Sequence, residues 1–238
     1  MTWIAPLTLF SALDYAAFAL LLLAWIGIGW RIENPSPSRP SVAELMADFR
    51  REWMRQLVTR QPRIFDANLI GNLRQSTAFF ASAAMIALGS GMALIRNPGP
   101  VEGLASDLAI APSPPVVWEL KLLLALLLLT SAFLKFVWAN RLFGYCSVVM
   151  GAVPNNAQDP LAAPRADQAA ELCISAARSF NRGLRTTYFA LAAATWLMGP
   201  IALIAATMLT VGMLYRREFG SSSREVLMQV PPDLADRP

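Results

Sequence analysis

The sequence contains no histidine and only two cysteines, Cys146 and Cys173. Histidine is the commonest metal ligand and the commonest acid–base group near neutral pH. Its absence excludes a His-ligated haem and weakens any zinc or triad interpretation. A phosphate-binding glycine loop is also missing, because the GIG and GSG stretches lie inside apolar blocks. We therefore expect no cofactor, no metal site and no catalytic residue, and so no enzyme.

Long polar stretches are scarce, and the apolar residues, 55% of the chain, are gathered into blocks. Blocks of about 20 apolar residues match the roughly 30 Å hydrocarbon core of a bilayer. They predict transmembrane helices at about 8–30, 74–95, 116–141 and 185–215. The expected fold is all-α, a polytopic integral membrane protein whose single membrane domain covers 1–238. No Lys or Arg precedes the first block, so we expect it to be retained rather than cleaved as a signal peptide.

The arginines are distributed unevenly among the links between these blocks. Eight lie from Arg31 to Arg74 and five from Arg141 to Arg185, whereas the link between the second and third blocks holds one. Loops rich in Lys and Arg lie in the cytoplasm. This predicts a four-helix bundle in a bacterial inner membrane, with both basic links cytoplasmic and both termini periplasmic. The paired arginines after the last block, at 216 and 217, conflict with that topology.

Two cytoplasmic amphipathic helices are expected at about 41–60 and 164–182, and a loose tail at 221–238. The first begins with a capping box, Ser41 with Glu44. Its apolar stripe fits a helix lying in the membrane interface and equally a helix packed on its own bundle. We further expect a bend at Gly183 and a kink of the last transmembrane helix at its Gly–Pro pair.

The second block carries small residues four apart, Ala83, Ala87 and Gly91. Small residues let membrane helices approach closely. We expect this face to form an internal seam of the bundle rather than a contact between copies, although the sequence leaves both open.

Charged residues in and beside the third block are the main candidates for a site. A stripe at spacings of three, three and four carries Lys135, Trp138, Arg141 and Tyr145. We predict a basic, amide-rich pocket where this stripe meets two neighbouring helix starts, which carry Asp66, Asn68, Asn72, Arg74, Gln75, Arg182 and Arg185. Asp66 is the expected counter-ion of Lys135 or Arg141. The alternative is that these groups only cap helices and anchor lipid head groups.

Asp14 is a separate candidate, because it falls within the first apolar block. An ionisable residue inside a membrane helix is a functional candidate. If the helix begins one residue later, at Tyr15, the carboxylate is instead interfacial. Both interpretations stay open.

Four stretches together resemble a known family: NLIGNLRQSTAFFAS, WELKLLLALLLLTSAFLKFVWANRLFGYCSVVMGAVP, ARSFNRGLRTTYFALAAATW and LYRREF. They are similar to the bacterial membrane proteins, with plant relatives, grouped as domain of unknown function 599. The resemblance covers roughly residues 10 to 220. It implies a multi-pass membrane protein and carries no activity that could be transferred to individual residues.

Three classes of function remain. The first is a non-enzymatic accessory or scaffold protein that binds anionic phospholipid head groups, another membrane complex or a second copy of itself. The second is a small oligomeric transporter or channel with a basic cytoplasmic entrance. The third, a membrane enzyme, has the least support because no catalytic motif is present. No feature indicates a nucleic-acid partner.

Overall fold

The computed structural model describes residues 9–97, 99 and 114–229. Within these ranges the chain is helical and contains no β-strand, only one isolated bridge between Ser36 and Arg39. The helices are α1 (Ala12–Glu33), α2 (Val42–Thr59), α3 (Ile64–Arg96), α5 (Pro115–Gly151), α6 (Ala162–Ala194), α7 (Pro200–Phe219) and α8 (Ser222–Met228), with a short 3-10 helix, η2 (Thr195–Met198), after α6. The all-α class is confirmed.

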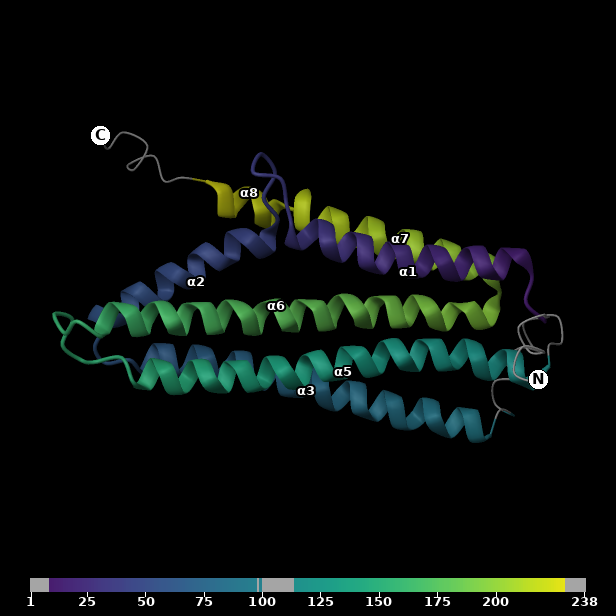
Figure 1. The fold of residues 1–238 in the computed structure, drawn as a ribbon, viewed down its shortest axis with the longest axis horizontal. Coiled ribbons are helices and arrows are strands. Elements are labelled where there is room, and N and C mark those ends of the chain that lie inside the picture. Colours follow the sequence, from purple (N-terminus) through teal and green to yellow (C-terminus); the bar gives the residue numbers. More distant parts are fainter. Residues whose placement is uncertain (1–8, 98, 100–113, 230–238) are drawn as a thin grey trace.

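The long helices run roughly along one axis (Figure 1). The antiparallel pair α5 and α6 forms the centre, with α3 against α5 and α2 against α6. The pair α1 and α7 lies side by side on the other side of α6. The bundle has two halves of different composition, which meet at the middle of α6.

Within the described residues, three helices are long and apolar enough to cross a membrane: α1, α3 and α5. Their outward faces carry large apolar side chains, such as Leu23 at 70% exposure and Ile86 at 71%. A protein in water rarely exposes apolar surface on this scale. The fold is thus compatible with a membrane protein.

The predicted helix at 185–215 is wrong, because the chain reverses in its middle. Gly199 has a φ of 120°, which only glycine adopts without strain. Pro200 then starts α7 at the first helical position, where its missing N–H is no loss. As a result α7 runs back along α6, and Arg217 Nη1 lies 3.4 Å from the Tyr188 hydroxyl. The expected kink is a hairpin.

The expected bend at Gly183 is also wrong, since α6 is one continuous helix through this position. The predicted amphipathic helix at 164–182 is the first part of α6. Gly183 serves close packing instead: a Cβ built there would lie 2.6 Å from the Phe136 ring of α5. The glycine lets the two central helices approach each other.

Other boundaries differ less from the predictions. The helix expected from 74 begins at Ile64, and the helix expected at 116–141 continues to Gly151. The tail expected to be loose contains α8, and residues 230–238 lie outside the described residues. Helix α1 begins at one end of the bundle, and α8 lies toward the other (Figure 1).

Helix α2 packs on the bundle, which decides between its two interpretations. Met54 and Leu57 are buried in a core cluster that also contains Cys146 of α5 and Cys173 of α6. On its rim, Arg51 Nε donates to Glu171 Oε1 of α6 at 2.9 Å. This hydrogen bond raises the pKa of Arg51.

The small-residue seam of α3 forms in part. Gly91 is buried as predicted, but the other buried positions on this face are Thr77 and Ala84, seven apart, rather than Ala83 and Ala87. A Cβ on Gly91 would lie 2.4 Å from Leu126 Cδ2, so α3 and α5 touch closely there. Ala83 and Ala87 line an open apolar groove beside this seam.

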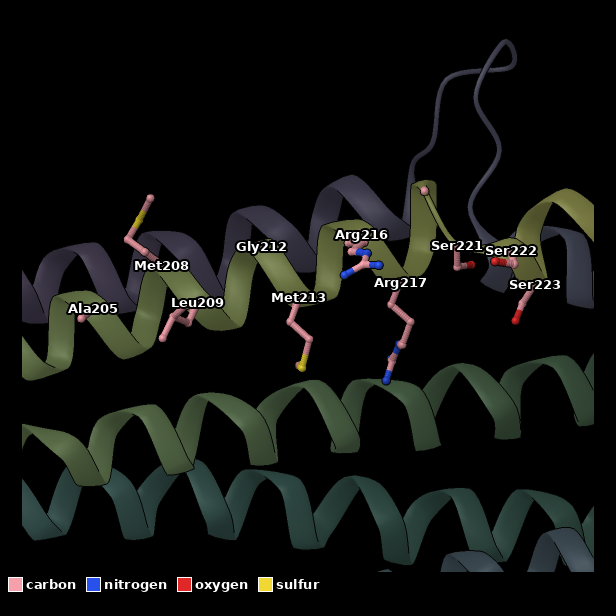
Figure 2. A pocket seen from close by; sticks show the side chains of 11 residues that line it. Ala205, Met208, Leu209, Gly212, Met213, Arg216, Arg217, Ser221, Ser222 and Ser223 are labelled. Atoms are coloured by element: carbon pink, nitrogen blue, oxygen red, sulfur yellow. The ribbon is translucent and has the colours of Figure 1, made fainter.

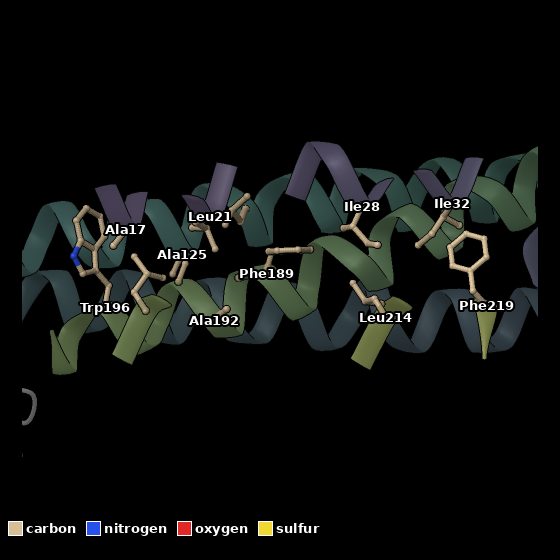
Figure 3. Packing of buried hydrophobic residues seen from close by; sticks show 14 residues of the cluster. Ala17, Leu21, Ile28, Ile32, Ala125, Phe189, Ala192, Trp196, Leu214 and Phe219 are labelled. Atoms are coloured by element: carbon tan, nitrogen blue, oxygen red, sulfur yellow. The ribbon is translucent and has the colours of Figure 1, made fainter. Parts of the chain in front are cut away.

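The apolar half of the bundle consists of α1, α7, η2 and the adjoining parts of α3, α5 and α6. On α1 the buried residues recur at spacings of four and seven, which places them on one helical face. They pack against Phe189 of α6 and against Leu214 and Phe219 of α7 (Figure 3). Those α1 residues are Ala17, Leu21, Ile28 and Ile32.

The basic half consists of α2, the first part of α3, the last part of α5 and the first part of α6. Its core combines large side chains, such as Phe143 and Met150 of α5, with small ones from α6, namely Ala169, Ala170, Cys173, Ala176 and Ala177. Small residues at helical spacing on α6 let α5 and α6 approach each other closely. The two halves meet near Glu33, the last residue of α1.

Candidate functional site

Lys135 lies at the junction of the two halves and turns into the bundle. Its Nζ donates to Ser131 Oγ at 2.7 Å and to Thr186 Oγ1 of α6 at 3.1 Å. The ammonium also lies 5.2 Å from the Trp25 ring centroid of α1, within the range of a cation–π contact. Two hydroxyls and an indole therefore hold this lysine between three helices.

The carboxylate beside this lysine is Glu33, which the sequence analysis did not single out. Arg182 Nε donates to Glu33 Oε1 at 2.8 Å, and both Arg182 and Arg185 form ion pairs with Glu33. Arg185 is buried, with 5% exposure. A signal existed in the sequence: Glu33 is an acid placed where the first apolar block ends, next to a basic link.

Thr186 connects the lysine to the rest of this cluster. Its Oγ1 accepts from Trp25 Nε1 at 3.2 Å and donates to the Arg182 carbonyl at 2.8 Å. We call this set the junction network: Trp25, Glu33, Lys135, Arg182, Arg185 and Thr186. It joins α1, α5 and α6 through groups that are mutually paired, so it is suited to fixing helix positions rather than to acid–base chemistry.

The structure does not bring Asp66 to Lys135 as predicted. Asp66 lies in the first turn of α3, in the basic half, where Trp53 Nε1 donates to its Oδ1 at 2.7 Å. Arg60 forms an ion pair with the same oxygen. About ten helical residues of α5, or roughly 15 Å, separate Lys135 from the Cys146 level, where the basic-half core is built. The expected counter-ion is therefore in a different place.

The amide-rich pocket does not form either. Asn68, Asn72 and Gln75 are exposed on α3. Arg74 is exposed too, but it lines a cavity together with Asp66. The predicted site is thus divided between the junction network and this cavity.

The remainder of the α5 stripe lies on the outer surface. Trp138 and Tyr145 are 50% and 42% exposed. Arg141 Nε donates to the Tyr145 hydroxyl at 2.5 Å. An arginine between two exposed aromatic rings is a typical arrangement at a membrane interface.

Asp14 lies in the first turn of α1, at the opposite end of the apolar half. It forms a capping box with Ser11, whose N–H donates to Asp14 Oδ2 at 3.1 Å. Trp196 Nε1 donates to Asp14 Oδ1 at 2.7 Å. Lys121 lies close by, 5.7 Å from the Trp196 ring centroid. The carboxylate is thus a helix cap at the end of the bundle, fastening α1 to η2.

A groove of about 1100 Å³ runs along α7 and ends at the start of α8 (Figure 2). Met213 and Arg217 project from α7 toward α6 in this view. The apolar side chains lie along α7, and the polar ones gather where α7 ends. We call this the α7 groove, lined by Ala205, Met208, Leu209, Gly212, Met213, Arg216, Arg217, Gly220, Ser221, Ser222 and Ser223.

Sequence reasoning missed the α7 groove because it treated residues 185–215 as one helix. That placed Arg216 and Arg217 at the far end of the bundle from the other arginines. In the structure the hairpin at Gly199 brings them back to the junction. The signal available was the Gly–Pro pair together with the unexplained basic residues after the last block.

The two cysteines are free thiols, buried between α5 and α6. Cys146 Sγ donates to the Ala169 carbonyl at 3.3 Å. In the described part of the chain, no three His, Cys, Asp or Glu side chains come together as a metal site would require.

Comparison with known proteins places the chain in a family. The family model described as "Protein of unknown function, DUF599" matches residues 16–223. No curated protein and no solved structure matches the chain. The match covers most of the sequence, so the suspected resemblance is confirmed.

Proposed function

Because this chain belongs to the family of proteins of unknown function DUF599, we propose its function from geometry. It is a non-enzymatic accessory protein of the bacterial inner membrane that binds anionic phospholipid in the α7 groove. Five helical segments cross the bilayer: α1, α3, α5, the second part of α6 with η2, and α7.

Helix lengths support this bilayer placement. The uncharged stretch of α3 between Arg74 and Arg96 is about 33 Å long at 1.5 Å per residue. On α5, Trp118 and Trp138 are about 30 Å apart. Both lengths match a hydrocarbon core of roughly 30 Å, and tryptophans favour its two interfaces.

The hairpin also removes the conflict in the charge distribution. With α7 returning along α6, Arg216 and Arg217 belong to the same side as the two basic links. All the arginine-rich segments then face the cytoplasm, as the positive-inside rule expects. The N-terminal end of α1 faces the periplasm, and α8 faces the cytoplasm.

The α7 groove carries the lipid proposal. Its long wall is apolar, with Leu209 exposed at 74% and Met208 at 56%, which suits acyl chains. Its junction end presents Arg216, Arg217 and three serine hydroxyls, which suit a phosphate. Arginine binds phosphate through several N–H groups at once, so an anionic head group fits better than a neutral one.

The internal pairing of charges favours binding over transport. Glu33 already forms ion pairs with both Arg182 and Arg185, and Lys135 is held by hydroxyls and an indole. Moving an ion past these groups requires breaking contacts that fix three helices. Native mass measurement separates the two classes: an accessory protein migrates with a defined larger complex, whereas a small transporter runs as a homo-oligomer.

Lipid retention tests the proposal. The double variant Arg216→Gln/Arg217→Gln should reduce co-purifying anionic phospholipid at least threefold in native mass spectrometry. The matched control is Arg55→Gln/Arg178→Gln, which removes the same charge from exposed positions of α2 and α6 and should leave retention unchanged. Equal lipid loads in the wild type and both variants would refute lipid binding in the α7 groove.

A further inference from the structure

A cavity of about 440 Å³ lies in the basic half, between α2, α3 and the end of α5. Its volume is in the range of small-molecule sites. It is separate from both the α7 groove and the junction network. Its polar lining consists of Arg63, Asp66, Arg74, Ser147 and Asn155.

Asp66 gives this cavity an unused acceptor. The side chain is buried, with 1% exposure. Trp53 and Arg60 both donate to Oδ1. The other oxygen, Oδ2, is buried and has no hydrogen-bond partner among the described residues. A buried carboxylate oxygen without a donor is unfavourable, so a group that donates a hydrogen bond is expected there.

Arg63 gives the cavity an unused donor. Its guanidinium is held by the carbonyls of Val153 and Pro154, at 2.7 and 2.8 Å. Its Nε is buried and likewise lacks a partner within the described chain. A hydroxyl both donates and accepts, so one hydroxyl group can satisfy an orphaned acceptor and an orphaned donor in the same cavity.

The charge of the lining selects an anion. Two arginines and one carboxylate line the cavity, and Arg60 already neutralises that carboxylate from the side. Arg74 forms no ion pair with any described residue. Arg74 lies about two helical turns after Asp66 on α3 and lines the same cavity. Cationic ligands are disfavoured here.

We infer that this cavity binds a small anion bearing both a phosphate and a hydroxyl, of the glycerol phosphate class. The phosphate is held by Arg74, and the hydroxyl lies between Asp66 and Arg63. The source is a soluble polyol phosphate or the head group of a glycerol-bearing phospholipid. The site does not depend on lipid binding in the α7 groove.

Ligand pairs that differ only in hydroxyls test the inference on the purified full chain. Glycerol 3-phosphate should bind at least tenfold more tightly than propyl phosphate, by calorimetry, if the source is soluble. If the source is lipid, phosphatidylglycerol should be retained at least fivefold over phosphatidylpropanol in nanodiscs. Either preference supports the site. The ligand pair that shows the preference, together with the variants below, identifies whether the ligand is soluble or a lipid head group.

A glycine provides a variant that blocks the cavity without touching its charges. Gly71 lines the cavity, and a Cβ there meets nothing within 4 Å. Gly71→Leu should fill the space, remove the preference between the paired ligands, and stabilise the helix, since leucine is the better helix former. Gly89→Leu, in equally open space on the same helix, is the matched control and should keep the preference.

Asp66→Asn should also reduce the preference, because its amide nitrogen replaces the acceptor. The inference is overturned if the wild type shows no preference in either ligand pair, which means that the cavity holds only water. It is also overturned if Gly71→Leu retains the wild-type preference. Neither result affects the lipid retention expected of the Arg216→Gln/Arg217→Gln variant.

Discussion

The apolar half and the basic half share the helices α3, α5 and α6, yet their surfaces differ. Both cores mix large and small side chains: the apolar half buries Phe189 and Leu214, and the basic half buries Phe143 and Met150 beside the alanines of α6. The apolar half exposes further large apolar side chains, whereas the basic half exposes charged groups. Helix α6 passes from one half to the other at Arg182 and Arg185, so the charged network lies where an apolar surface gives way to a charged one.

The largest effect is expected from labelling of introduced cysteines, which reports on which side of the membrane each end of the bundle lies. Each introduced cysteine should either react or not react in intact cells. Ser223→Cys, at the start of α8, should react with a membrane-impermeant maleimide only after cells are lysed. Asn97→Cys, at the end of α3, should react in intact cells. The native cysteines are buried and should react in neither case.

The control for this labelling is Ala157→Cys, in the connection between α5 and α6, which should behave like Ser223→Cys. Labelling of Ser223→Cys in intact cells would place α8 in the periplasm. The five-segment topology would then be wrong, and the C-terminus would be periplasmic, as the charge distribution of the sequence predicts.

Removing the carboxylate of the junction network should produce the largest loss of stability. Glu33→Gln leaves Arg185 buried without its ion pair. We expect unfolding in detergent to be easier by about 3 kcal/mol, the lower end for breaking a buried ion pair, because Glu33 keeps 20% side-chain exposure. Differential scanning fluorimetry measures this as a lower melting temperature.

The matched control for Glu33 is Glu52→Gln on α2, whose pair with Arg55 is long, at 3.9 Å, and exposed. Exposed pairs contribute about 0 to 1 kcal/mol, so little change is expected. Equal effects of the two substitutions would mean that the junction network does not join the two halves.

A smaller effect is expected from filling the close contact between α5 and α6. Gly183→Ala introduces a Cβ 2.6 Å from the Phe136 ring. Overpacking of this kind costs about 1 to 3 kcal/mol. Gly144→Ala, in open space on α5, should instead stabilise the protein by about 1 kcal/mol, the helix propensity difference. Thermal unfolding of both variants in the same detergent compares them directly, and a stabilised Gly183→Ala would show that α6 can shift.

The positions of most helices could be predicted from the sequence, whereas the angles at which successive helices connect could not. Apolar blocks of the right length located α1, α3 and α5, because helix formation in an apolar setting depends on the local sequence. The Ser41–Glu44 signal located the start of α2, where Ser41 Oγ accepts from the Glu44 N–H at 3.3 Å. The Gly199 turn was read as a kink, because sequence shows that a helix breaks there but not by what angle the chain leaves.

The candidate site shows the same division. Lys135, Arg182 and Arg185, which were predicted to lie in one pocket, do lie near one another. The sequence analysis paired Lys135 or Arg141 with Asp66 and did not consider Glu33, because both acids lie next to basic links and only the packing of α1 against α6 distinguishes them. Arg216 and Arg217 were noted as a conflict, and the hairpin explains them.

The sequence by itself determined the all-α class, the family, the apolar blocks and the concentration of arginine in a few segments. These are properties of local composition and periodicity. The tertiary structure alone decided the reversal at Gly199, the position of Glu33 between two arginines and the cavity beside Asp66. Each depends on which helices lie next to each other, and that is set by close contacts such as Gly183 with Phe136 between residues far apart in the chain.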